Sequence, residues 1–171
     1  MGKAEILKGR NTSEITKDDY LESVKLSMNT KKKIVEVLLC LVLIVLGGYG
    51  HYSGTIKWGA LFGFIGVFML IWELFLSAYV IGNRAYKKAV RESKGKDIIV
   101  KIDFYKDHLD LKNPTNQKVS LKYKNINQLR SGKKVVVLLF NRDEFAVTFK
   151  KDSFTFGNCE DIEKMINEAR A

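Results

Sequence analysis

One long stretch of the chain is almost free of charge, and it limits what the protein can fold into. Residues 34–82 hold only two of the 19 acidic and one of the 29 basic side chains in the 171-residue chain. A soluble amphipathic helix must present a polar face to water, and a run of this length with three charges has none to offer. The stretch therefore predicts membrane-spanning structure.

The apolar stretch divides into two spans joined by a short connection. A helix over residues 34–52 would be about 28 Å long and one over residues 58–82 about 37 Å, against a hydrocarbon thickness of about 30 Å. Residues 51–57 leave room only for a tight hairpin turn. A signal peptide is the competing interpretation of the first span, but residues 1–33 are too long and too mixed in charge for its basic leader.

Basic side chains predict the orientation of this hairpin. They flank both spans on the side of the chain termini, while the connection has Lys57 alone. The flanking bases are Lys31, Lys32, Lys33, Arg84, Lys87, Lys88, Arg91, Lys94 and Lys96. Segments rich in Lys and Arg stay in the cytoplasm, so we expect a multi-pass protein of the inner (plasma) membrane with both termini cytoplasmic.

The same bases are also candidates for contact with anionic lipid headgroups, at about 1 kcal/mol each. The candidates are Lys31, Lys32, Lys33, Arg84, Lys87, Lys88 and Arg91. A role in orientation alone is the alternative.

The remainder of the chain has the pattern of short antiparallel strands and two amphipathic helices. Strands are expected near residues 4–8, 98–104, 109–111, 119–123, 126–129, 135–140 and 145–149, with turns at 106–107, 113–116 and 141–143. Thr16 is expected to begin one helix, and Asn158 to cap another at the C-terminus. In the last strand, Val147 and Phe149 should be buried and Lys150 exposed.

The expected fold class is therefore a membrane α+β protein, in which a two-helix transmembrane hairpin carries a cytoplasmic antiparallel β domain closed by a C-terminal α-helix. This outline is that of a pleckstrin-homology-like (PH-like) barrel. The expected parts are an N-terminal strand and helix at 1–33, the hairpin at 34–82, a basic juxtamembrane segment at 83–96 and the PH-like domain at 97–171.

Several short segments carry a family resemblance that covers nearly the whole chain. They are TKDDY at 16–20, Asn-Arg at 83–84, FYKDHLDL at 104–111, the Tyr123-x-x-Ile126 step, and FKKDSF at 149–154 followed by Gly157. In this order, around a two-span hairpin, they resemble the YcxB-like family of bacterial membrane proteins, and the last segment is similar to the family's K-x-x-F element. The resemblance implies a bacterial membrane protein with a cytoplasmic PH-like domain and no well-defined biochemical activity.

Glu73 is the candidate functional residue within the spans. It lies about three residues from the middle of the second span, where an acid costs on the order of 3 kcal/mol. Counted inward from the cytoplasmic ends, the facing level of the first span is residues 41–43, with Cys40 the nearest polar group. Glu73 could serve a partner subunit or a proton-linked site, and a protonated or snorkelling side chain in a tilted helix is the alternative.

Glycines in both spans are candidates for helix packing. Gly59, Gly63 and Gly66 have the spacing of small residues that lets helices approach closely, and Gly47 and Gly48 stand at the same outer level of the first span. Packing within the hairpin and a homodimer seam both fit this pattern.

Residues for catalysis are few. His108 is expected to be a solvated turn residue, and the sequence shows no Cys/His cluster, carboxylate pair or phosphate-binding glycine loop. We therefore expect no enzyme activity, catalytic residue, metal or cofactor. Nucleic acid is not expected as a partner either, because no helix is basic on one face and no aromatic platform accompanies the bases.

The predicted function is that of a non-enzymatic membrane protein that presents a PH-like interaction module to a protein partner or anionic lipid, with a homo-oligomer also open. A small accessory subunit of a transporter, or a membrane immunity or stress protein using Glu73, is the alternative.

Overall fold

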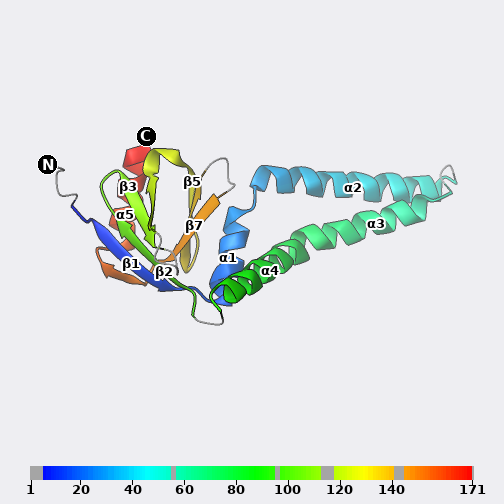
Figure 1. Ribbon diagram of the computed structural model, residues 1–171. Coiled ribbons are helices and arrows are strands. Elements are labelled where there is room, and N and C mark those ends of the chain that lie inside the picture. Colours follow the sequence, from blue (N-terminus) through cyan, green and yellow to red (C-terminus); the bar gives the residue numbers. More distant parts are fainter. Residues whose placement is uncertain (1–5, 55–56, 95–96, 113–117, 141–144, 171) are drawn as a thin grey trace. The chain divides into compact units, whose positions relative to one another are not determined.

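The computed structural model describes residues 6–54, 57–94, 97–112, 118–140 and 145–170 (Figure 1). The chain is an α+β protein with antiparallel sheets, which confirms the α+β and antiparallel part of the expected class. In order, its elements are β1 (Gly9–Glu14), α1 (Lys17–Ser27), α2 (Thr30–Tyr52), α3 (Gly59–Ile71), the π-helix η1 (Trp72–Leu76), α4 (Ser77–Glu92), β2 (Ile99–Phe104), β3 (His108–Lys112), β4 (Lys118–Lys122), the 3₁₀ turn η2 (Tyr123–Asn125), β5 (Ile126–Ser131), β6 (Val135–Phe140), β7 (Phe145–Lys150), β8 (Phe154–Phe156) and α5 (Cys159–Arg170).

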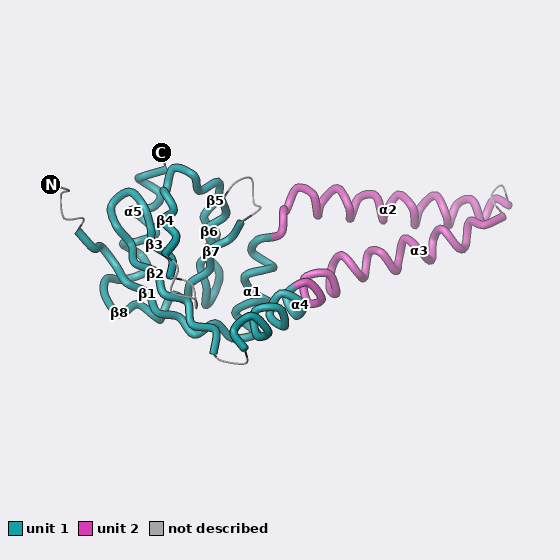
Figure 2. Tube along the Cα trace, in the orientation of Figure 1, with its two compact units in different colours: residues 1–27, 82–171 teal, residues 28–81 magenta. Residues whose placement is uncertain are grey.

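The chain forms two compact units (Figure 2). The folded domain comprises residues 1–27 and 82–171, and the hairpin comprises residues 28–81. The N-terminal segment therefore belongs to the same domain as the strands that follow the hairpin, and the expected division between 1–33 and 97–171 is wrong.

Strand pairing across the hairpin insertion explains this discontinuity. β1 pairs antiparallel with β2 from Gly9 opposite Phe104 to Glu14 opposite Ile99. The strand expected at 4–8 thus occurs later, at residues 9–14. Because the first two strands of one sheet lie on opposite sides of the insertion in sequence, neither part of the domain can complete that sheet alone.

Two antiparallel sheets enclose the core of the folded domain. One has the strand order β4-β3-β2-β1-β8 and the other β5-β6-β7. Inward-facing Ile102, Phe104 and Leu109 are fully buried, together with Tyr123 and Phe149. The loops expected at 113–116 and 141–143 lie outside the described residues.

Strand β6 is buried on both faces, as expected of the apolar run Val135–Phe140. Its alternate residues Val136 and Leu138 join the core between the sheets. Val135 and Val137 face the other way and pack with Leu26 of α1. Helix α1 therefore covers the outer face of the three-stranded sheet.

Helix α5 completes the core. Its N-cap is Asn158, whose side-chain oxygen accepts a hydrogen bond from the Asp161 backbone N–H at 2.8 Å. Ile162 and Ile166 are buried in the main core, and Ile162 lies so close to Gly9 that a Cβ atom there would be 2.8 Å from its Cδ1. The predicted C-terminal helix is confirmed.

The hairpin consists of long apolar helices. Helix α2 has 23 residues, and α3, η1 and α4 form one helical run of 34 residues, Gly59–Glu92. Both are long and apolar enough to cross a membrane. Large side chains on them, such as Phe64 and Phe75, are more than two-thirds exposed. The basic segment expected at 83–96 continues the second helix as far as Glu92.

Candidate functional site

Close backbone contact between α2 and α3 occurs at glycines. A Cβ atom at Gly47 would lie 2.7 Å from the Gly59 carbonyl oxygen and 2.9 Å from Gly63 Cα. Gly59 and Gly66 are similarly confined, whereas a Cβ at Gly48 would meet nothing within 4 Å. The glycine spacing of the second span is thus used inside the hairpin, and Gly48 faces away from the contact.

The same contacts determine which residues of α2 lie level with Glu73. Gly66 lies against Cys40 and Ile44 of the antiparallel helix α2. Glu73 follows Gly66 by seven residues, which is about two turns on the same helix face. Two turns back along α2 from Cys40 and Ile44 lie residues 33–37, which include Lys33 and Glu36 as well as three apolar residues.

The facing level expected for Glu73, residues 41–43, is therefore wrong. The end of α2 and the beginning of α3 lie side by side at the turn. The helical run Gly59–Glu92 is longer than α2, so its last residues extend past the first residue of α2. Lys33 and Glu73 occupy facing stripes at this level, and both are partly buried. Glu73 thus stands level with the first residues of α2, where Lys33 and Glu36 flank the apolar Ile34 and Val35.

The helix is locally irregular at Glu73. Residues Trp72–Leu76 form a π-helical turn between α3 and α4. The Ser77 hydroxyl donates to the Glu73 carbonyl oxygen at 3.2 Å. Single π-turns inside α-helices occur frequently at functional sites, so Glu73 remains a candidate.

The first basic cluster begins α2. Asn29 caps this helix, and its side-chain oxygen accepts from the backbone N–H groups of Lys31 and Lys32. The Lys32 ammonium lies 3.7 Å from a carboxylate oxygen of Glu36. Lys31 and Lys32 are exposed, while Lys33 is partly buried.

The second basic cluster forms one face of α4. Arg84, Lys87, Lys88 and Arg91 follow the i, i+3, i+4, i+7 spacing of a helical stripe, and all four are exposed. We call these four residues the basic face of α4. The expectation that no helix is basic on one face is therefore wrong, because the segment after the span continues as helix.

The outer face of the five-stranded sheet carries an ion network. Arg10, Asp103 and Asp110 are successive cross-strand partners on β1, β2 and β3. Arg10 Nε and Lys112 Nζ lie 2.5 and 3.4 Å from the two Asp103 oxygens. Burial alone would raise the pKa of Asp103, but these two cations outweigh it and hold the pKa below its usual range. Lys118 Nζ lies 2.7 Å from the buried Asp110.

His108 belongs to this network and is not a solvated turn residue. It begins β3 and is buried, with Nδ1 2.7 Å from the Asp107 carboxylate and its ring stacked on Tyr105 at 4.8 Å. The Ser120 hydroxyl donates to Asp110 at 2.7 Å, and His108 Nε2 is 3.9 Å from the same oxygen. Serine and histidine both face the carboxylate, which is not the arrangement that activates a serine nucleophile.

Lys150 also departs from expectation. Val147 and Phe149 are buried as predicted, but Lys150 is only 22% exposed and its ammonium lies 3.7 Å from Asp19. Asp19 is itself buried and accepts hydrogen bonds from the backbone N–H and hydroxyl of Thr16. Lys150 therefore neutralises the acid that caps α1.

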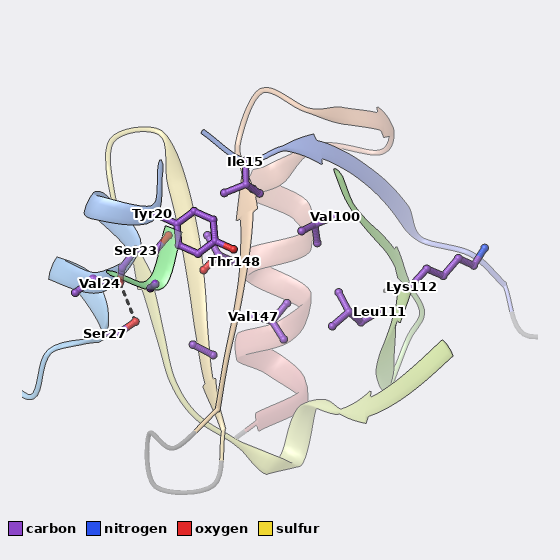
Figure 3. Close-up of a pocket in the computed structure, with 12 residues that line it drawn as sticks. Ile15, Tyr20, Ser23, Val24, Ser27, Val100, Leu111, Lys112, Val147 and Thr148 are labelled. Carbon is purple, nitrogen blue, oxygen red and sulfur yellow. Dashed lines mark hydrogen bonds between the residues drawn. The ribbon is translucent and has the colours of Figure 1, made fainter. Parts of the chain in front are cut away.

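A cavity of about 270 Å³ lies within the folded domain. Its walls come from α1, α4, β2, β3, β7 and the residue after β1 (Figure 3). Most of the lining is apolar. The lining residues are Ile15, Tyr20, Ser23, Val24, Ser27, Ala85, Val100, Leu111, Lys112, Ala146, Val147 and Thr148.

The hydroxyl groups around the cavity fall into two classes. Ser23 and Ser27 donate to backbone carbonyls of α1, at 2.7 and 2.8 Å, so their protons are already used. Within the described part of the chain, the hydroxyls of Tyr20 and Thr148 make no such bond. Burial raises the pKa of Tyr20, with smaller contributions from Glu92 and a neighbouring tyrosine, so its hydroxyl stays protonated and can donate.

No protein-family model matches the chain, and no curated protein is significantly similar to it. The YcxB-like resemblance therefore stays a prediction. The cavity was not foreseen because its walls come from five elements spread along the sequence. The only available signal was the run of hydroxyl residues Tyr20, Ser23 and Ser27, which share one face of α1.

Proposed function

We propose that this protein is a non-enzymatic, membrane-anchored interaction module of the inner membrane. The apolar hairpin crosses the bilayer, both termini are cytoplasmic, and the folded domain is a PH-like barrel that engages anionic lipid or a protein partner at the membrane surface. Five-plus-three strand sheets with a C-terminal helix support the PH-like assignment.

The insertion of the hairpin between β1 and β2 carries this proposal. Both ends of the apolar hairpin lead directly into one folded domain, whose sheet is completed only by strands on either side of it. Two such connections tether the domain more tightly than one flexible linker would. The basic face of α4 follows the apolar helix without a break, where it favours anionic lipid.

Cysteine accessibility tests the topology. On a background lacking Cys40 and Cys159, a membrane-impermeant thiol reagent applied to intact cells should modify Ser53→Cys and spare Ser131→Cys. Ser53 follows α2 at the turn, and Ser131 is an exposed residue of β5. Modification of Ser131→Cys in intact cells would contradict the proposed orientation.

A second candidate function is an accessory subunit of a transporter, or a membrane immunity or stress protein, that uses Glu73. The π-helical turn at Glu73 favours it. In that case Glu73→Gln should insert normally yet lose the phenotype and co-purification with the partner. Full function of Glu73→Leu would eliminate this candidate.

A further inference from the structure

We propose that the cavity of the folded domain binds one fatty-acyl chain of an anionic membrane phospholipid. This inference rests on the membrane anchoring proposed above and names the lipid contact of the module. The acyl chain lies along the apolar wall, and its ester carbonyl accepts hydrogen bonds from the hydroxyls of Tyr20 and Thr148.

The lining selects an uncharged, apolar group. Val100, Leu111 and Val147 form one side of the cavity, opposite Tyr20 and Ser23 of α1 (Figure 3). Among the described residues of the lining, Lys112 alone is charged, and its ammonium lies 3.4 Å from Asp103 on the outer face of the sheet. The described lining therefore does not counter the charge of a ligand, so the part that enters the cavity is neutral.

Two hydroxyls supply the polar end. The hydroxyls of Tyr20 and Thr148 line the cavity and have no hydrogen-bond acceptor among the described residues. The hydroxyls of Ser23 and Ser27, in contrast, already donate to backbone carbonyl oxygens of α1. Two donors beside an apolar wall fit a carbonyl group attached to a hydrocarbon chain.

Chain position and charge identify a membrane phospholipid as the source. Ser27 is the last residue of the domain before the hairpin, and Ala85 lies three residues after the domain resumes at Gly82. On the basic face of α4, Arg84 directly precedes Ala85 and Lys88 follows it by three residues, and both are exposed. Both cations are thus available, close in sequence to a lining residue, to an anionic phosphate that stays outside the cavity.

The test uses the full chain in nanodiscs of phosphatidylcholine containing phosphatidylglycerol with a diazirine near the end of one acyl chain. After illumination and digestion, label is expected on peptides containing Val100, Leu111 and Val147 as well as on the hairpin. Hairpin label without label on these peptides overturns the cavity proposal alone. An unlabelled hairpin overturns the membrane anchoring. Labelling of the cavity by a diazirine fatty acid but not by the phospholipid overturns the assigned source.

Matched variants locate the label. Ala85→Phe fills the cavity and should reduce label on the cavity peptides about tenfold, while Ala89→Phe, one turn along α4 and outside the lining, should leave it unchanged. Tyr20→Phe removes one donor and should reduce the label about fivefold, with Tyr86→Phe as its control. This second pair decides the matter if Ala85→Phe does not fold, and equal labelling within the pairs overturns the proposal.

Discussion

Replacing Gly47 by alanine should open the hairpin, because the new Cβ would meet backbone and not a movable side chain. It would lie 2.7 Å from the Gly59 oxygen and 2.9 Å from Gly63 Cα. Optimal carbon contacts are about 3.5–4.0 Å, so the helices must separate by roughly 0.6–1.3 Å. Overpacking of this kind costs about 1–3 kcal/mol, offset by up to about 1 kcal/mol of better helix propensity. The net expectation is about 1–2 kcal/mol of destabilisation.

The chain offers a matched control and a local signal for this measurement. Gly48 is the neighbouring glycine, and a Cβ there would meet nothing within 4 Å, so Gly48→Ala should be neutral or slightly stabilising. The two tryptophans of the protein, Trp58 and Trp72, both lie in the hairpin. Their fluorescence therefore reports on the hairpin when bicelle-bound protein is titrated with dodecyl sulfate.

The unfolding midpoint should fall for Gly47→Ala and stay or rise for Gly48→Ala. Equal midpoints would refute the reasoning, because they would mean that α2 and α3 do not meet at Gly47. A fall for Gly48→Ala alone would indicate that the opposite face of α2 makes the tighter contact, as in a homodimer seam.

Three further predictions concern the folded domain. Lys150→Glu places a second acid beside buried Asp19. It should lower the melting temperature by an amount corresponding to about 1–3 kcal/mol, which is more than an ordinary surface substitution costs. An unchanged melting curve would contradict the ion pair. Because the pKa of Asp103 is lowered in the folded state, its pairing with Arg10 stabilises the domain above pH of about 4 and is lost as the pH falls through the folded pKa. The melting temperatures of wild type and Asp103→Asn should therefore converge on acidification, and a constant difference would exclude this linkage. Burial raises the pKa of Cys159 to about 12, so iodoacetamide at pH 8 should alkylate it far more slowly than a denatured control, and equal rates would show an open thiol.

The strands that could be predicted are those whose burial is visible in their own residues. Val135–Phe140 is a continuous apolar run and is strand β6 over those same residues. The helix at Asn158 is likewise signalled by a cap and an apolar stripe. In both cases local sequence and tertiary burial favour the same structure, so pattern reasoning succeeds.

Strand β1 could not be predicted because its inward positions are polar. Asn11 and Ser13 are fully buried, yet they bond to the backbone of β7: the Asn11 amide donates to the Lys150 oxygen at 2.8 Å, and the Lys150 N–H donates to the Ser13 hydroxyl at 3.0 Å. Side-chain hydrogen bonds from β1 to β7 thus join the two sheets in place of main-chain hydrogen bonds between these strands. Apolar alternation cannot identify such a strand, and the apolar residues at 4–8 drew the prediction to the wrong segment.

Among the candidate functional residues, the sequence could identify only those whose role depends on spacing within a single helix. The glycine spacing is local, so Gly59 and Gly66 could be chosen from the sequence. The level of Glu73 depends on the register of two helices, and the cavity depends on five elements meeting in space. Neither is contained in any single segment.

The pairing of β1 with β2 across residues 15–98 also sets an order of events in folding. β1 emerges first during synthesis, but its partner is not available until the whole hairpin has been made. Closing so long a loop is entropically slow, and antiparallel association of α2 with α3 shortens it by bringing the two ends back toward each other. The five-stranded sheet therefore closes after the hairpin forms, and a chain whose hairpin fails to pair leaves β1 and the edge of β2 exposed to degradation.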